Sequence, residues 1–222
     1  NIYVTLAKKE VFGTVGIDML AGPSEIVIVA DEFAEPSYIA ADLLSQAEHD
    51  PLSRSVLITM SEKLAAMVTG HLKEQLETLP RREVAIRSLK EQGAIVLVAS
   101  LNDAWPVVND LAPEHLELHL TESWRYLEQI NNAGAIFIGP YAPESLGDYW
   151  AGSNHVLPTG QAARYASALG VHDFIKRSEV IYYSRQQLCD SADKIAALAR
   201  AEGLEVHARS VLLRRHLNEK NG

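Results

Sequence analysis

The stretch EIVIVA, residues 25–30, is a run of β-branched and small apolar residues that follows a single charged position. Such a run predicts a strand buried on both faces, as in a parallel sheet with helices on each side. Runs of similar texture recur at SVLITM (55–60), AIVLVA (94–99), HLELHL (115–120) and AIFIG (135–139). Helix-forming segments separate these runs, and the repeated alternation predicts an α/β fold with a mostly parallel sheet flanked by helices.

The helices are predicted from apolar periodicity and from proline positions. Pro36 begins a helix whose apolar stripe includes Ile39 and Leu43, and Pro51 marks its end. Further helices are expected at 2–11, 62–79, 82–92, 102–111, 123–131 and 191–202, with a last one near His207. Asn1 suits the N-cap of the first helix, and Gly203 is placed to end the helix before it. Residues 140–170 are rich in Gly, Pro, Ser and Asn, which predicts an irregular segment of the kind that builds sites.

Composition excludes several classes of protein. The 222 residues are 47% hydrophobic and carry a formal net charge of −9. No apolar run approaches the roughly 20 residues that span a bilayer, so no membrane segment is expected. Basic residues cluster only around Arg209, Arg214 and Arg215, which argues against nucleic acid as a partner. The single Cys189 excludes an internal disulfide framework, no signal-peptide pattern is present, and we therefore expect a cytoplasmic location.

Several polar residues are candidates for a metal site, although each has an ordinary interpretation. Gln46 and His49 fall on neighbouring positions of one predicted helix, so both can reach a common ion. A Gln and a His near a helix end are more often surface or capping groups. Asp148 and His207 also have the simpler interpretation of a loop carboxylate and an exposed helix-start residue. An imidazole combined with oxygen donors would suit zinc.

The dipeptide Glu114-His115 places a carboxylate beside an imidazole, a combination suited to proton transfer. A strand begins here, and adjacent strand residues point to opposite faces. The pair can share one pocket only if the backbone is irregular, and an exposed Glu with a half-buried His is an equally good interpretation. Of the other histidines, His155 is expected to be structural, and the rest to be surface or locally satisfied groups: His71, His119, His172 and His216.

Longer blocks of sequence resemble the histidinol dehydrogenase family. The blocks are IDMLAGPSEIVIVAD (17–31), DLLSQAEHD (42–50), APEHLEL (112–118), PESLGDYWAGSNHVLPT (143–159) and EGLEVHA (202–208). They follow the family's order over essentially the whole chain. Elements such as Ala-Gly-Pro-Ser-Glu and Gln-Ala-Glu-His are specific to that family and are not general features of a fold.

The resemblance implies a zinc-dependent enzyme that oxidises L-histidinol through an aldehyde to L-histidine, the last step of histidine biosynthesis, and reduces two NAD. It implies an acid/base pair, Glu114 and His115. It implies zinc ligation by Gln46, His49, Asp148 and His207, which also contact the substrate together with His115, Ser24 and Glu202. Asn1 corresponds to a position near the nicotinamide. In the family the tail reaches into the partner subunit, so a homodimer is implied, with Glu202 and His207 completing the partner's site.

The resemblance also implies a division of the chain into three parts. Residues 1–22 would be a remnant helix and linker of the cofactor domain, 23–169 a Rossmann-like catalytic domain, and 170–222 a helical tail that docks on the partner subunit. The family's long N-terminal portion, which carries most of the NAD-binding domain, does not match this chain, and no Gly-x-Gly-x-x-Gly motif is present.

We therefore expect a C-terminal half of the enzyme with little turnover alone. One alternative is a non-catalytic zinc- or imidazole-binding half that needs a separate N-terminal partner. A zinc hydrolase in which Glu114 activates water is a further alternative, which no sequence block supports.

Overall fold

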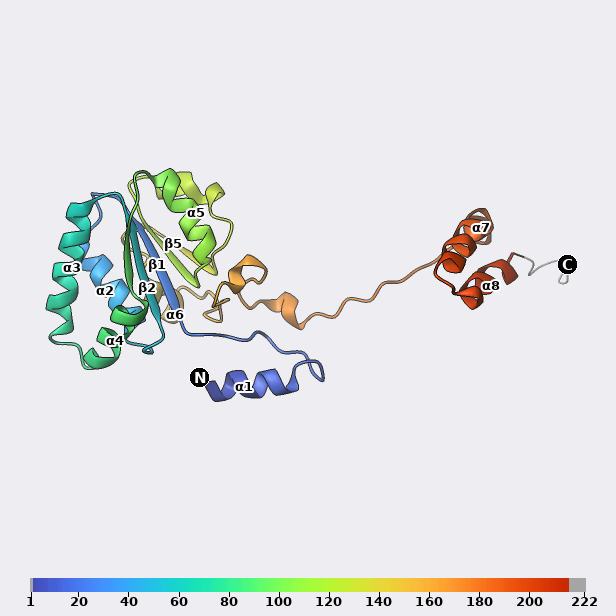
Figure 1. Cartoon of the computed structure of the whole chain (residues 1–222), viewed down its shortest axis with the longest axis horizontal. Helices are drawn as coiled ribbons and strands as arrows, with labels where there is room; N and C mark the ends of the chain where they lie inside the picture. The colour runs from blue at the N-terminus through green and yellow to red at the C-terminus, as the bar shows by residue number, and fades with distance from the viewer. Residues whose placement is uncertain (1, 216–222) are drawn as a thin grey trace. The chain divides into compact units, whose positions relative to one another are not determined.

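A computed structural model describes residues 2–215 of the chain. The chain divides into two compact units, Asn1–Phe174 and Ile175–Gly222 (Figure 1). The first unit contains all the strands of the described chain, and the second contains the last two helices.

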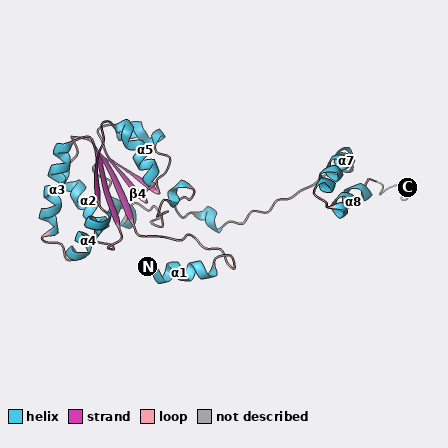
Figure 2. Cartoon of the chain, in the orientation of Figure 1, coloured by secondary structure: helices cyan, strands magenta, loops and turns pink. Residues whose placement is uncertain are grey.

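A five-stranded sheet in the order β3-β2-β1-β4-β5 forms the centre of the first unit (Figure 2). Its strands are β1 (Glu25–Ala30), β2 (Arg54–Thr59), β3 (Ala94–Leu97), β4 (His115–His119) and β5 (Ala135–Ile138). Every neighbouring pair is parallel, and Ile26 of β1 stands beside Ser55 of β2 and His115 of β4. The predicted α/β fold with a parallel sheet is confirmed.

Different helices cover the two faces of β1, which is why all six of its residues are buried. On one face Ile26 and Ile28 pack against α2 (Pro36–Ala47) and α3 (Glu62–Leu76). On the other face Val27 and Val29 pack against α5 (Leu101–Leu111) and the 3-10 helix η1 (Ser123–Gln129). A further helix, α4 (Arg82–Gln92), lies on the side of α2 and α3, as Figure 1 shows.

The strands that follow β1 in the chain lie on both sides of it in the sheet. Strands β2 and β3 lie on one side of β1, and β4 and β5 lie on the other. The connections around β1 and β4 therefore diverge, and in open parallel sheets such a point leaves a crevice outside the carboxyl ends of the strands. Strands β1 and β4 are consequently the pair around which sites are expected.

Helix starts follow the local sequence. Pro36 occupies the first turn of α2, where its missing N–H has no consequence, and the Glu35 side chain accepts a hydrogen bond from Ser37 N. Ser61 caps α3 in the same manner. These caps place the starts of α2 and α3 where the sequence predicts them.

The structure differs from the predicted elements in three places. Residues 140–170, predicted to be irregular, contain helix α6 (Glu144–Tyr149) and the 3-10 helix η2 (Ala162–Arg164), and the 3-10 helix η3 (Val171–Phe174) follows them. The segment predicted as an α-helix at 123–131 is the 3-10 helix η1. The helix predicted from residue 191 begins earlier, because Ser184 and Gln187 form a capping box at its start.

The second unit is a pair of helices, α7 (Arg185–Ala201) and α8 (Glu205–Leu213). Gly203 lies between them with φ of 76°, a left-handed conformation that ends α7 as predicted. The buried residues of the two helices are Ala192, Ala196 and Ala208, while Leu198 and Val206 are exposed. Helix α1 (Ile2–Val11) of the first unit buries none of its residues.

No helix within residues 2–215 combines the length and apolar character needed to cross a membrane.

Candidate active site

Three of the predicted site residues lie at the amino ends of β1 and β4. Ser24 is half-buried and immediately precedes β1, while Glu114 and His115 stand where β4 begins. Because β1 and β4 are parallel neighbours, their first residues lie side by side at the same edge of the sheet. Sequence positions about ninety residues apart are thereby brought together.

The main chain of Glu25 holds both members of the Glu114–His115 pair. Glu25 N donates to Glu114 Oε2 at 3.0 Å, and the Glu25 carbonyl lies 3.0 Å from His115 Nδ1. The two side chains approach to 3.7 Å between His115 Nδ1 and Glu114 Oε2. Both residues are buried, with exposed fractions of 6% and 3%, so the interpretation of an exposed Glu and a half-buried His is wrong.

The backbone before β4 explains how adjacent residues share one environment. Ala112 ends α5 in the left-handed region, with φ of 45°. Glu114 lies outside the regular strand, and its carbonyl accepts from Ala135 N. The alternation of faces therefore does not apply at this step. Gly134 is required beside it, because a Cβ there would lie 2.6 Å from the Glu114 carbonyl oxygen.

The Glu25 carbonyl also determines which nitrogen of His115 carries the proton. A carbonyl can only accept, so Nδ1 carries the hydrogen and Nε2 presents a lone pair in the neutral ring. Nε2 is buried and has no hydrogen-bond partner among the described residues. Burial lowers the pKa of His115, which keeps the ring neutral at physiological pH. His115 therefore offers an unprotonated, unpartnered nitrogen, as a general base requires.

Burial acts on Glu114 in the opposite sense. Burial, together with the neighbouring carboxylates of Glu25, Glu144 and Asp148, raises the pKa of Glu114 to about 8, although the hydrogen bond from Glu25 N lowers it. A carboxyl group with this pKa exchanges its proton near neutral pH. It is therefore suited to an acid or a base role.

Helices α2 and α6 bring the predicted metal ligands of the first unit towards this pair. Gln46, near the end of α2, is fully buried, and within the described chain neither its amide oxygen nor its nitrogen has a partner. His49 lies in the exposed turn after α2, close enough for its charge to lower the pKa of His115. Asp148 is half-buried on α6, and its charge raises the same pKa. His49 and Asp148 therefore lie near His115, and Gln46 is the buried residue of α2 three positions before His49.

Glu144, in the first turn of α6, belongs to this cluster although the sequence analysis did not select it. Its carboxylate, one His115 nitrogen and an Asp148 oxygen all lie within 4.8 Å of one another. Glu144 is 3% exposed and accepts from Ser45 Oγ at 3.1 Å. Burial, and then the Asp148 charge, raises the pKa of Glu144 to about 7. Glu144 was not predicted because residues 140–170 were expected to be irregular.

The donor set fits a borderline cation such as zinc. Imidazole nitrogens, carboxylate oxygens and an amide oxygen are available from His49, His115, Asp148, Glu144 and Gln46. A buried amide with no partner is costly, and a bound ion would satisfy the Gln46 oxygen. Asp148 is common to the predicted ligand quartet and to the observed cluster.

A cavity of about 490 Å³ lies next to these residues. Its lining includes Ser24 and His49, two of the predicted substrate contacts, together with Gly22 and Ser53. Thr159 holds the loop before β1, because its Oγ1 accepts a hydrogen bond from Gly22 N. The volume is within the range of small-molecule sites.

The remaining predicted residues lie outside this cluster. Glu202 and His207 are exposed residues of the second unit. Asn1 lies outside the described residues.

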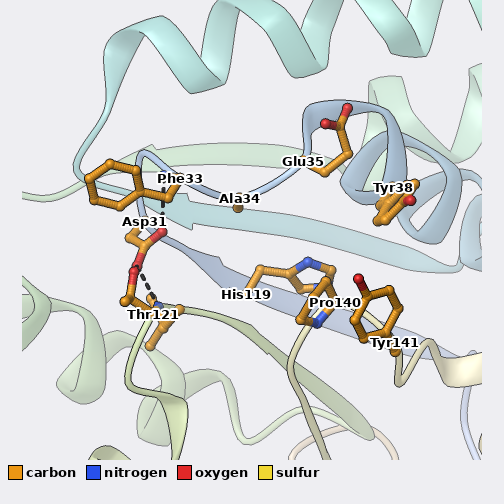
Figure 3. Close-up of a pocket in the computed structure, with 10 residues that line it drawn as sticks. Asp31, Phe33, Ala34, Glu35, Tyr38, His119, Thr121, Pro140 and Tyr141 are labelled. Atoms are coloured by element: carbon orange, nitrogen blue, oxygen red, sulfur yellow. Dashed lines mark hydrogen bonds between the residues drawn. The ribbon is translucent and has the colours of Figure 1, made fainter.

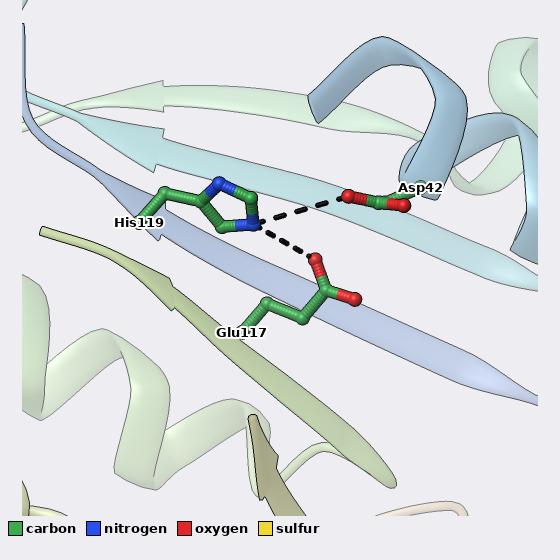
Figure 4. Close-up of side chains that lie close together, drawn as sticks. All are labelled: Asp42, Glu117 and His119. Atoms are coloured by element: carbon green, nitrogen blue, oxygen red, sulfur yellow. Dashed lines mark hydrogen bonds and ion pairs between the residues drawn. The ribbon is translucent and has the colours of Figure 1, made fainter. Parts of the chain in front are cut away.

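A second polar cluster lies between β4 and α2 and is formed by Asp42, Glu117 and His119 (Figure 4). His119, expected to be a surface or locally satisfied group, is buried, and its Nε2 lies 3.1 Å from Glu117 Oε2. Burial, and then the charge of Glu117, raises the pKa of Asp42 to about 8. The alternation in HLELH could have revealed this cluster, because His115, Glu117 and His119 lie on one face of β4.

His119 also contributes to a cavity of about 470 Å³ beyond the carboxyl ends of β1 and β4 (Figure 3). Asp31 joins the two loops there, accepting from Thr121 N at 2.6 Å and from Thr121 Oγ1 at 2.8 Å. The other lining residues include Phe33, Tyr38 and Tyr141.

Comparisons with known proteins identify the family of this chain. The sequence profile of the family described as histidinol dehydrogenase matches residues 1–215. A histidinol dehydrogenase of Moorella thermoacetica is 58% identical over 214 residues, which are 96% of this chain and 50% of that protein. One of Halalkalibacterium halodurans is 56% identical over the same lengths.

A solved structure gives the same result. The crystal structure of histidinol dehydrogenase from Elizabethkingia anophelis matches with a TM-score of 0.86 and 38% identity, covering 96% of this chain and 49% of that one. The chain thus spans about half the length of the relatives that it matches. On the sequence profile, the relatives and the shared fold, the chain belongs to the histidinol dehydrogenase family.

Proposed function

We propose that this chain supplies the zinc and substrate site of a histidinol dehydrogenase, which oxidises L-histidinol to L-histidine with reduction of two NAD. The observation that carries the proposal is the buried Glu114–His115 pair, held by the Glu25 main chain beside a cluster of metal-competent side chains. The similarity to whole histidinol dehydrogenases supports the choice of substrate.

His115 acts as base in the first oxidation. A hydride leaves an alcohol carbon only as the hydroxyl proton is removed, and the unpartnered Nε2 can accept that proton. The neutral ring and the fixed Nδ1–H leave this nitrogen available at physiological pH. Proton removal by His115 thus allows the hydride to pass to NAD, and histidinol becomes the aldehyde.

Glu114 acts in the second oxidation. Water must add to the aldehyde carbon before a second hydride can leave, and an ionised carboxylate removes the proton of that water. The pKa of about 8 leaves a usable ionised fraction near neutral pH. Two bases in one pocket therefore serve two oxidations.

The substrate is held by the residues around the pair. Gln46, His49 and Asp148, with His207 from the tail, are the proposed ligands of zinc, and Ser24 and Glu202 contact the substrate. Zinc, when bound, would position the amine and imidazole nitrogens of histidinol. We assign Asn1 to the nicotinamide end of NAD, and Glu202 and His207 to the site of the partner subunit in a homodimer.

The proposal is tested by NADH formation from L-histidinol, measured by absorbance with the natural gene product. Removal of metal with a chelator should abolish the activity, and added zinc should restore it. His115→Ala should lower kcat by about 10²–10⁴-fold, the usual contribution of a general base.

His71→Ala is the matched control, because His71 is a partly exposed side chain of α3 that pairs with Glu74. It should retain wild-type activity. A His115→Ala enzyme with normal kcat, or a chelated enzyme with normal activity, would contradict the proposal.

A second candidate is a zinc- or imidazole-binding module without turnover of its own. This candidate is considered because the chain matches only about half the length of the whole enzymes. Calorimetry with zinc and histidinol, alone and with an added N-terminal half, separates the two: binding in both mixtures with no NADH in either supports the module.

A further inference from the structure

Glu117 is the most deeply buried carboxylate near the site, with an exposed fraction of 1%. Its Oε1 accepts from Glu144 N at 2.7 Å, and its Oε2 lies 3.1 Å from His119 Nε2 (Figure 4). Both oxygens are therefore engaged. A carboxylate at the centre of a strand is costly to bury, and these bonds offset that cost.

The contacts of Glu117 join the three elements that carry the proposed site of the first unit. Glu117 lies on β4, two residues after His115, and its bond to Glu144 N holds the start of α6, which carries Asp148. Asp42 on α2 lies 3.9 Å from the same His119 nitrogen that contacts Glu117. Four residues later, the same helix carries the buried Gln46, a proposed zinc ligand.

Helix α6 depends on this support because of its own sequence. It has six residues, and its N-cap is Pro143, which offers no side-chain acceptor to the first amides. Glu117 supplies the acceptor that a capping Ser or Asp would otherwise give. Ser45 of α2 adds a second tie, through its bond to the Glu144 carboxylate.

We propose that Glu117 is a positioning residue of the zinc and substrate site, which acts through the main chain of Glu144 to place Asp148 against His115. This inference rests on the proposed function for its chemical consequence. The role is one of positioning because the two oxygens of Glu117 face Glu144 N and His119, and its effect on Asp148 passes through the main chain of Glu144.

Two substitutions separate positioning from mere packing. Glu117→Leu fills similar volume but removes the acceptor for Glu144 N. Glu117→Gln keeps an amide oxygen for Glu144 N, and its NH₂ group can face His119 in the tautomer that accepts at Nε2. The leucine variant should lose about 10–100-fold in zinc affinity, as is typical when a supporting partner of a ligand is removed.

The glutamine variant should restore zinc affinity to within about 3-fold of wild type, well inside the loss typical for a removed supporting partner. Zinc affinity is measured by competition with a chromogenic chelator, using the natural gene product. With saturating zinc, Glu117→Leu should lower kcat more than it raises KM, because the misplaced group lies beside the reacting pair. Hydrogen exchange of the Glu144–Tyr149 amides should be faster in Glu117→Leu even without metal.

Ser123→Ala is the matched control, because Ser123 is buried at the other end of β4 and donates to the Leu118 and Leu120 carbonyls. It removes buried hydrogen bonds without touching α2 or α6, so zinc affinity should not change. Equal zinc affinity in Glu117→Leu and wild type, or equal loss in the leucine and glutamine variants, overturns the positioning role while the proposed function stands. A wild-type protein that neither binds zinc nor oxidises histidinol overturns both.

Discussion

At the scale of single residues, the proposed chemistry depends on where protons reside in one buried pair. The Glu25 carbonyl fixes the hydrogen of His115 on Nδ1, and burial moves the pKa values of His115 and Glu114 in opposite directions. The imidazole is thereby a base near neutral pH, and the carboxyl group titrates at about pH 8. Environments that separate two titrating groups in this manner are typical of acid/base sites.

The Glu114 pKa predicts a pH dependence for the second oxidation. A base must be ionised, so the rate of NADH formation from histidinol aldehyde should rise with pH and level off above about 8. Glu114→Gln should lose about 10²-fold in this rate and show no rise through that region. Glu91→Gln, an exposed helix residue paired with Arg87, is the control. A rate that falls from pH 7 to 9 in wild type would disprove the assignment.

At the scale of elements, helix α6 packs directly on Phe137, the aromatic residue beside His115. This contact sets the position of α6 at the site. Gly147 of α6 has no room for a side chain: a Cβ would lie 2.7 Å from Phe137 Cε1. Phe137 in turn contacts the His115 ring, with 5.9 Å between centroids. Phe137 of β5 therefore packs between helix α6 and the His115 ring of β4.

Gly147→Ala should consequently destabilise the protein by about 1–3 kcal/mol, the usual cost of overpacking, and should weaken zinc binding. Gly70→Ala in α3 is the matched control, because nothing lies within 4 Å of its added Cβ. It should stabilise the protein by about 0.5–1 kcal/mol and leave zinc affinity unchanged. Thermal unfolding and a chelator competition measure both effects. Unchanged zinc affinity in Gly147→Ala would count against the coupling of α6 to the site.

The sequence predicts elements well where one local signal is sufficient. Apolar runs located all five strands, and prolines with apolar periodicity located α2 and α3. Helix α6 was missed because its start is stabilised by Glu117, a distant residue on β4, and its own six residues carry little periodicity. The short length of α6 and its stabilisation by a distant residue explain why it was missed while α2 and α3 were predicted.

Predicting the site required more than local patterns. Gln46, His49, Asp148 and the Glu114–His115 pair were individually ambiguous, and only the resemblance to a family grouped them. In the fold, the parallel pairing of β1 and β4 places the pair on the Glu25 main chain, a contact that no spacing rule reveals. Glu144 and Glu117 were missed because their roles depend on side-chain contacts between separate elements.

At the scale of the whole molecule, several buried carboxyl groups retain their protons near neutral pH. The pKa values of Asp42 and Glu114 are raised to about 8, and that of Glu144 to about 7. In the unfolded chain such groups ionise near pH 4 to 5. The folded protein thus binds more protons than the unfolded chain between these limits, and its stability falls as pH rises through that range.

We therefore expect the free energy of unfolding, measured in urea with chelator present, to be lower at pH 8.5 than at pH 6.5 by about 1–3 kcal/mol. The lowered pKa of His115 makes the stability rise with pH, but only below the ordinary histidine pKa of 6.5. Fluorescence of the buried Trp105 reports on the first unit. Asp42→Asn with Glu114→Gln should flatten the dependence, and a wild-type protein that is more stable at pH 8.5 would refute this account.

The anchoring of the pair by main-chain atoms has a consequence for sequence divergence. Any residue except proline at position 25 supplies the same N–H and carbonyl to Glu114 and His115. The Glu25 carboxylate meanwhile raises the Glu114 pKa. Evolution can therefore retune the working pH of this pair by exchanging one side chain on β1, while the positions of the two groups are inherited unchanged.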